Sequence, residues 1–84
     1  MKMTKENFMV FVNKESFNDM VGIWNYHHKA GNLTNQGEKK RELMNSLLEW
    51  KNNNYNEESF KSVERLYISC VEHNIDLTHF FDIM

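Results

Sequence analysis

The chain has 84 residues, 40% of them hydrophobic, with six Phe, three Tyr and two Trp. This is the length of one small domain, and the apolar content favours a packed core over disorder. Ten basic and 12 acidic residues give a net charge of -2, which is too neutral for a protein whose main task is to coat nucleic acid.

The compartment is suggested by the cysteine count and by the apolar runs. Cys70 is the single cysteine and has no partner for an internal disulfide, which is typical of a reducing compartment. The longest apolar run, from Phe8 to Val12, is five residues, against the ~20 that a membrane span needs. The first seven residues lack the apolar run of a signal peptide. We therefore expect a cytoplasmic protein without stable membrane insertion.

The first two predicted helices cover Lys5–Val12 and Lys14–Ala30. Thr4 and Asn13 are the expected N-caps, because their side-chain oxygens can accept from the free N–H groups of a first helical turn. Gly31 suits the left-handed position that closes a helix. The second helix has one apolar stripe with a period of 3.6 residues: Phe17, Met20, Val21, Trp24 and His28.

The third and fourth predicted helices cover Asn35–Lys51 and Glu57–His73, with Asn56 as the expected N-cap of the fourth. The third begins after Thr34, and its apolar stripe includes Leu43, Met44, Leu47 and Leu48, with Trp50 at the edge. Gly37 lies on the same side and would allow a neighbouring helix to come close. The stripe of the fourth helix is Phe60, Val63, Leu66, Tyr67, Cys70 and Val71.

A short helix at Leu77–Ile83 would complete the chain. Asn74 suits the left-handed position after the fourth helix, with Ile75 packing back on Cys70. Four of the five predicted starts have an apolar residue before the cap and another four positions inside the helix, a hydrophobic staple; the pairs are Met3 with Phe8, Val12 with Phe17, Tyr55 with Phe60, and Ile75 with Phe80.

Alternation of apolar and polar residues, typical of strands, is nearly absent, and the chain has no Asn-Gly or Asp-Gly pair. The sequence therefore predicts a single all-α domain over residues 1–84, a compact bundle of about five helices, three long and two short. Phe17, Trp24, Leu47 and Tyr67 should be mostly buried.

Catalytic and metal-binding signatures are weak. The chain has no phosphate-binding glycine loop, no His-Glu-x-x-His pair and no nucleophile motif. Cys70 and His73, with His27, His28 or His79, have side chains that suit zinc, but structural zinc sites usually show two close ligand pairs. A buried thiol is the simpler interpretation of Cys70. We expect no enzyme activity and no cofactor.

His27 and His28 end the second predicted helix, where the helix dipole favours imidazolium and a pH sensor is conceivable. By helical angle His28 faces inward and His27 lies at the edge of the stripe. A half-buried pair that caps the helix is the favoured interpretation.

The one basic run, Lys39, Lys40 and Arg41, gives a candidate nucleic-acid contact. Two helices joined by a short turn at Gly31 would then form a helix-turn-helix, with the second helix in the major groove. Glu38 and Glu42 flank the run and neutralise it, so a solvated helix face is the favoured interpretation.

A candidate protein-binding patch consists of Ile23, Tyr26 and Trp50. Tyr26 falls opposite the apolar stripe of its helix, and Ile23 and Trp50 fall at the edges of theirs, as Ile68 does. Interfaces favour Trp, Tyr and Met, and the chain has six Met, which adapt to irregular surfaces. Single exposed apolar residues are also normal in proteins without partners.

The stretch from Phe11 to Asp19, continued by residues 24–28 and 47–51, resembles the lysis-inhibition accessory proteins of T-even phages. The resemblance covers most of the chain and includes its Asn-, Lys- and Met-rich composition. It implies a cytoplasmic co-antiholin, which binds the cytoplasmic N-terminal part of the phage holin and supports the periplasmic antiholin in delaying lysis. It assigns no role to any single residue.

Three functional hypotheses remain open. The first is a protein-binding regulator, specifically a lysis-inhibition factor. The second is a small DNA-binding regulator built on the second and third helices, and the third is a phage inhibitor of a host enzyme. Homo-oligomerisation is compatible with each of them.

Overall fold

The computed structural model describes residues 4–77, and within this range it contains four α-helices and no strand. They are α1 (Lys5–Val12), α2 (Phe17–Lys29), α3 (Asn35–Asn52) and α4 (Glu57–Glu72). The all-α, compact architecture predicted from the sequence is confirmed. The predicted fifth helix, Leu77–Ile83, lies outside the described residues except for Leu77, which is buried and not helical.

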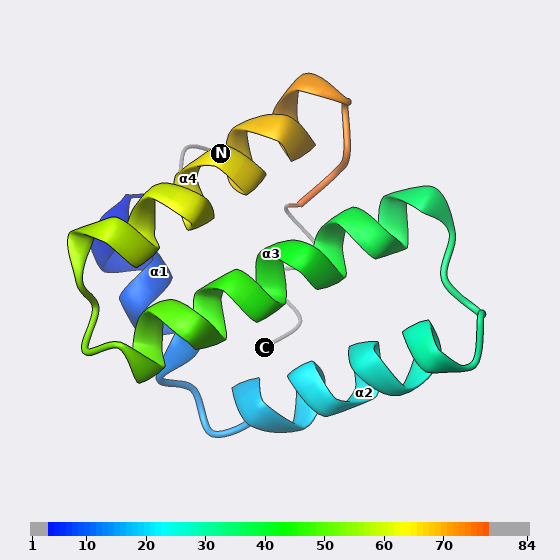
Figure 1. Cartoon of the computed structure of the whole chain (residues 1–84), viewed down its shortest axis with the longest axis horizontal. Helices are drawn as coiled ribbons and strands as arrows, with labels where there is room; N and C mark the ends of the chain where they lie inside the picture. The colour runs from blue at the N-terminus through cyan, green and yellow to red at the C-terminus, as the bar shows by residue number, and fades with distance from the viewer. Residues whose placement is uncertain (1–3, 78–84) are drawn as a thin grey trace.

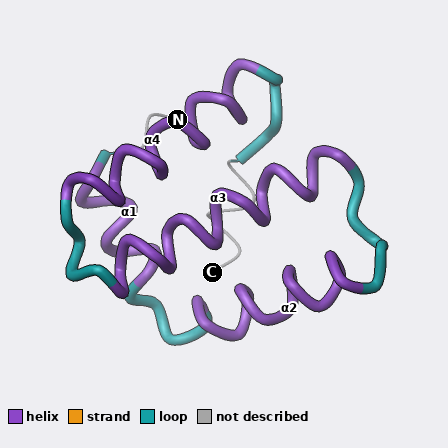
Figure 2. The backbone as a smooth tube through the Cα atoms, viewed as in Figure 1, coloured by secondary structure: helices purple, strands orange, loops and turns teal. Residues whose placement is uncertain are grey.

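The helix α3 is the central element and contacts each of the other three helices. Figure 1 shows α2 and α4 on either side of it, both antiparallel to it, and the same arrangement is visible in the backbone tube of Figure 2. The helix α1 contacts α3, and its Phe8 ring meets the rings of Phe60 and Tyr67 on α4 with centroids 6.1 and 5.4 Å apart. Phe11 meets Phe17 in the same edge-to-face manner, at 5.5 Å.

Three of the predicted N-caps are confirmed. The side-chain oxygens of Thr4, Thr34 and Asn56 accept hydrogen bonds from the backbone N–H three residues later, at 3.2, 3.1 and 2.8 Å. Each bond satisfies a donor that has no partner inside the helix. Three of the four helices in the described residues therefore begin at a cap supplied by a neighbour in the sequence.

The predicted cap at Asn13 is wrong, and α2 begins at Phe17 instead of Lys14. Asn13 ends α1, where its side-chain amide donates to the Met9 carbonyl at 2.7 Å. Its side-chain oxygen accepts from the Tyr55 hydroxyl at 3.2 Å. The oxygen that would have capped α2 is therefore engaged by a residue 42 positions away, and residues 13–16 form the turn between the helices.

Both predicted helix closures are confirmed. Gly31 has a φ of 72° and Asn74 a φ of 57°. After α2, the N–H of Asn32 donates to the His27 carbonyl at 2.9 Å, and after α4 the N–H of Ile75 donates to the Cys70 carbonyl at 2.9 Å. These six-residue bonds define Schellman motifs, and Ile75 is buried as expected.

The buried side chains form one cluster to which all four helices contribute. Phe17 and Leu47 are fully buried, and Trp24 and Tyr67 are largely buried and pack against the same cluster, as predicted. Val71, predicted on the core face of α4, is 53% exposed, because α4 is an outer helix that packs on α3 along one side. The fully buried side chains are Phe17, Leu43, Met44, Leu47, Trp50, Val12, Val63 and Cys70.

Candidate protein-binding site on α2

Trp50 does not belong to the candidate binding patch, and its predicted edge position is wrong. The side chain is 0% exposed and is covered by Tyr55 and Phe60, whose ring centroids both lie 4.9 Å from that of Trp50. A helix with one packed side would leave position 50 at an edge, but α3 is covered on several sides. Its indole nitrogen has no hydrogen-bond partner among the described residues.

Ile23 and Tyr26 are exposed, as predicted, at 55% and 68%. They lie on the side of α2 that faces away from the core, because α2 buries only Phe17 and Val21 against the rest of the bundle. Three other large apolar residues are more than half exposed among the described residues: Val10, Ile68 and Val71. Exposure alone therefore does not single out α2.

Two hollows distinguish α2 from the other exposed apolar positions. The first, about 370 Å³ in volume, is an almost wholly apolar groove, which we call the Leu33 groove; its lining residues are Met20, Ile23, Trp24, His27 and Leu33. The second, about 620 Å³, is shallower and more polar, and we call it the Gly22 hollow; it is lined by Asn18, Asp19, Gly22, Ile23, Tyr26 and His27. Ile23 and His27 separate the two.

The Leu33 groove depends on the chain reversal between α2 and α3. Gly31 turns the chain, and Leu33 then lies against the first turn of α3, where a Cβ added at Gly37 would come within 3.3 Å of the Leu33 side chain. The sequence had suggested that another helix comes close to Gly37, but this prediction is wrong. The close neighbour is Leu33 of the preceding loop. The glycine leaves space for the residue that forms one wall of the groove.

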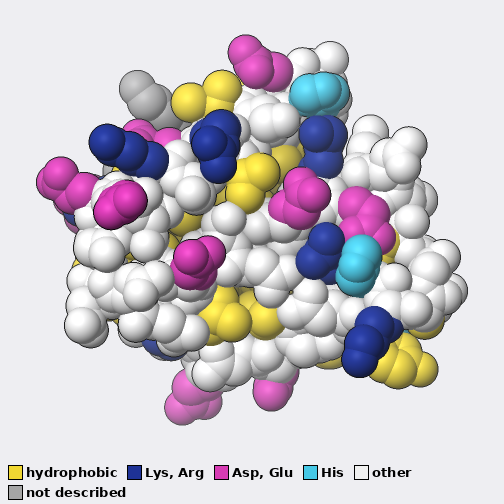
Figure 3. Space-filling model, viewed as in Figure 1, with side chains coloured by type: hydrophobic (Ala, Val, Ile, Leu, Met, Phe, Trp, Pro, Cys, Tyr) yellow, Lys and Arg dark blue, Asp and Glu magenta, His cyan; other side chains and the backbone are white. Residues whose placement is uncertain are grey.

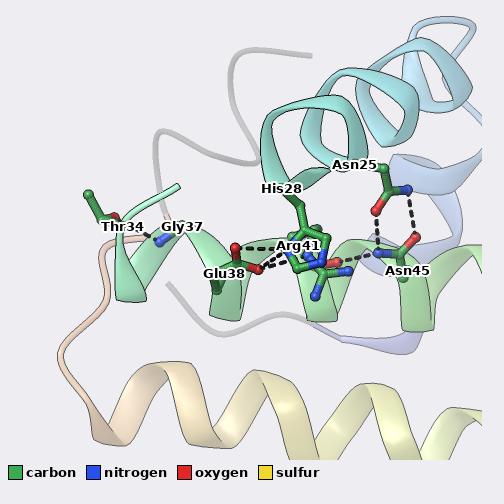
Figure 4. A network of polar contacts seen from close by, with 7 residues as sticks. All are labelled: Asn25, His28, Thr34, Gly37, Glu38, Arg41 and Asn45. Atoms are coloured by element: carbon green, nitrogen blue, oxygen red, sulfur yellow. Dashed lines mark hydrogen bonds and ion pairs between the residues drawn. The ribbon is translucent and has the colours of Figure 1, made fainter. Parts of the chain in front are cut away.

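Polar contacts hold α2 against α3 beside the groove (Figure 4). Asn25 and Asn45 exchange two amide hydrogen bonds, each 3.0 Å long, and Asn45 also donates to the Arg41 carbonyl at 3.1 Å. The ring nitrogen Nδ1 of His28 lies 2.8 Å from both carboxylate oxygens of Glu38. The Arg41 Nε donates to the same carboxylate at 2.9 Å.

These contacts change the interpretation of the two histidines. His28 was expected to face inward, but its side chain is 46% exposed and pairs with Glu38 on α3. His27 lines both hollows and meets Tyr26 edge-to-face, with ring centroids 5.4 Å apart.

The same contacts affect the acidity of Glu38. Hydrogen bonds from His28 and then Arg41 lower the pKa of Glu38 below its usual value of 4.5.

The basic run does not form a free cationic surface. Arg41 is paired with Glu38, and Lys39 and Lys40 are half-buried. The helices α2 and α3 lie side by side in antiparallel fashion in Figure 2, whereas the two helices of a helix-turn-helix cross at roughly 90–120°. Figure 3 shows basic and acidic side chains interspersed over the face in view. This geometry gives little support to a role in DNA binding.

The features considered for metal or covalent chemistry are also now placed. Burial is the main reason that the pKa of the Cys70 thiol is raised, and the thiol is 1% exposed, so its reactive thiolate form is disfavoured. Within residues 4–77, no group of three or more His, Cys, Asp or Glu side chains could hold a metal ion. None of the helices in that range is long and apolar enough to cross a membrane.

Within the described residues, the fold and site define a small all-α domain with an apolar groove on one outer helix. No protein-family model, no curated protein and no solved structure matches the chain. The assignment of a function therefore depends on the residues of this chain.

Proposed function

We propose that the chain is a non-enzymatic regulator that binds another protein through the Leu33 groove. The observation that carries this proposal is the groove itself, an apolar concavity bordered by the exposed Ile23 side chain. Contiguous apolar surface rimmed by polar residues is typical of sites that bind proteins or ligands. The rim here includes His27 and, on the other side of Ile23, Asp19 and Asn18.

The shape of the groove favours a helical segment as its occupant. Its walls come from two turns of α2 and from Leu33 in the loop. The groove is therefore elongated along the helix and is not a deep, enclosed cavity. An amphipathic helix places apolar side chains three and four residues apart on one face, which is the pattern that lies in such a groove. Two or three apolar side chains of the partner would fill it.

The partner that we propose is the cytoplasmic N-terminal part of a phage holin. This choice rests on the resemblance of the chain to the lysis-inhibition accessory proteins of T-even phages, and the groove is compatible with it. The protein would act in the cytoplasm of the host bacterium, where binding the holin segment supports the antiholin in delaying lysis.

Titration of the full-length protein with a synthetic peptide of the cytoplasmic N-terminal segment of a T-even holin tests this proposal. The same titration with mixed-sequence duplex DNA, both at about 50 and 200 mM salt, separates the alternatives. We expect peptide binding that changes little with salt, because the groove is apolar. A protein that contacts 6–10 phosphates would instead lose roughly 10³–10⁵-fold in affinity between these salt concentrations.

The other results have defined meanings. DNA binding that depends strongly on salt and disappears when Lys39, Lys40 and Arg41 are changed together, without peptide binding, would replace the proposal with the DNA-binding hypothesis. Binding to neither probe would contradict both and would leave the inhibitor of a host enzyme.

A further inference from the structure

The exposed face of α2 contains a glycine that the fold does not require. Gly22 lies in the interior of the helix, and a Cβ added to it would meet nothing within 4 Å. Glycine in a helix interior is unfavourable relative to alanine, and neither a turn nor a close contact within residues 4–77 explains it here. The missing side chain instead opens the Gly22 hollow between Asp19 and Tyr26, which both line it.

The charges along the same helix are ordered. Asp19 lies in the first turn of α2, and His27, His28 and Lys29 lie in the last turn. This order also suits the helix dipole, so it would not by itself indicate a partner. The centre of this helix face is apolar and exposed, however. When two copies of α2 lie antiparallel, the acidic first turn of each copy comes next to the basic last turn of the other, so the face is complementary to itself.

We propose that two copies of this chain pair through their α2 helices, antiparallel and related by a two-fold axis that passes beside Gly22 and Ile23. The Ile23 side chain of each copy then lies over Gly22 of the other. Asp19 of each copy lies near the basic last turn of the other, within reach of Lys29. A two-fold interface requires a surface that is complementary to itself. Here the opposite charges at the two ends of α2 provide it, and so does the fit of Ile23 over Gly22 at the centre.

This inference goes beyond the proposed function and uses the other side of Ile23. The Leu33 groove is lined by Met20, Trp24 and Leu33, none of which lines the Gly22 hollow. One helix pair is a small interface, at the low end of the size range, below about 1,200 Å². The dimer is therefore weak, with a dissociation constant on the order of 100 µM.

Sedimentation velocity of the full-length protein up to about 1 mM measures this equilibrium. Two charge reversals provide the discriminating test. Asp19→Lys alone and Lys29→Glu alone each place like charges opposite one another in both symmetric contacts, so each variant should dimerise about tenfold more weakly. In an equimolar mixture of the two variants, both contacts pair opposite charges, and dimerisation should return to about the wild-type strength.

Two further variants complete the test, one that should abolish the dimer and one control. Gly22→Gln fills the hollow of the dimer, while its side chain has free space in the monomer, so the variant should stay folded and monomeric. Lys61→Glu reverses an exposed charge on α4 and should leave the dimer unchanged. A wild-type protein that remains monomeric at about 1 mM, or a mixture that associates no better than the single variants, would overturn the proposal.

Discussion

Two regions of the bundle use the same kinds of side chain in opposite ways. Where α1, α3 and α4 meet, the aromatic side chains of Phe8 and Trp50 are enclosed, at 2% and 0% exposed. On the outer side of α2, Tyr26 is 68% exposed and Ile23 is 55% exposed. The inner side of α2 packs Phe17 and Val21 into the core, and Asn25 and His28 pair with α3 beside them. The outer side chains Ile23 and Tyr26 are thereby left exposed.

The largest effects should come from fully buried side chains, Leu47 on α3 and Phe17 on the inner side of α2. Leu47→Ala should lower the free energy of unfolding by about 2–5 kcal/mol, because it removes a fully buried side chain and leaves a cavity. Phe17→Ala should cost about 3–5 kcal/mol for the same reason. In a domain this small, either change would leave little stability, which urea denaturation followed by circular dichroism measures. Losses below about 1 kcal/mol would show that these side chains are not in the core.

A smaller effect is expected at the polar contact between α2 and α3. Asn25→Ala or Asn45→Ala leaves the amide of the partner without its hydrogen bonds in a partly buried position, which should cost about 1–3 kcal/mol. Because both variants lose the same pair of bonds, the double variant should be about 1 kcal/mol less destabilised than the sum of the singles. Strict additivity in this double-mutant cycle would mean that the two amides do not interact in solution.

A stabilising change is expected on the exposed face of α2. Gly22→Ala should raise the free energy of unfolding by about 1 kcal/mol, since alanine is the better helix former and its methyl group meets nothing within 4 Å. Thermal denaturation at low micromolar protein concentration measures the monomer alone. A lower melting temperature than that of the wild type would indicate that Gly22 is required by the fold and not by a partner.

The pH dependence of the His28–Glu38–Arg41 contact should be the smallest effect. The pKa of Glu38 is lowered in the folded protein, so its stabilising contribution is complete above the usual value of 4.5 and is lost as the pH falls through the lower folded-state pKa. Glu38→Gln should therefore melt below the wild type at pH 6 and together with it in strong acid, near pH 2. A difference that grows as the pH falls would contradict this sign.

Local chemistry was enough to predict much of the fold. The caps at Thr4, Thr34 and Asn56 and the closures at Gly31 and Asn74 depend on neighbours in the sequence, and the structure confirms them. The prediction at Asn13 was wrong because Tyr55, which is distant in the sequence, engages its side-chain oxygen. No local pattern contains that contact.

The candidate site was predicted only in part, for a related reason. Helical angle identified Ile23 and Tyr26 as exposed, because α2 packs on the described part of the bundle through one side only. It placed Trp50 at an edge because it cannot show that α3 is covered on several sides. The Leu33 groove was not predicted, since Leu33 joins α2 only after the chain reverses at Gly31.

Two exposed isoleucines offer the most direct test of the claim that α2 carries the binding site. Ile23 borders the groove and Ile68 lies on α4, and their exposures are nearly equal, at 55% and 53%. The measurement is calorimetric titration of Ile23→Gln and Ile68→Gln with the holin peptide, at low micromolar protein concentration, where the weak dimer is absent. We expect both variants to melt within a few degrees of the wild type. Ile23→Gln should bind at least about tenfold more weakly, whereas Ile68→Gln should bind like the wild type. Equal affinity of the two variants, or a loss confined to Ile68→Gln, would contradict the placement of the site on α2.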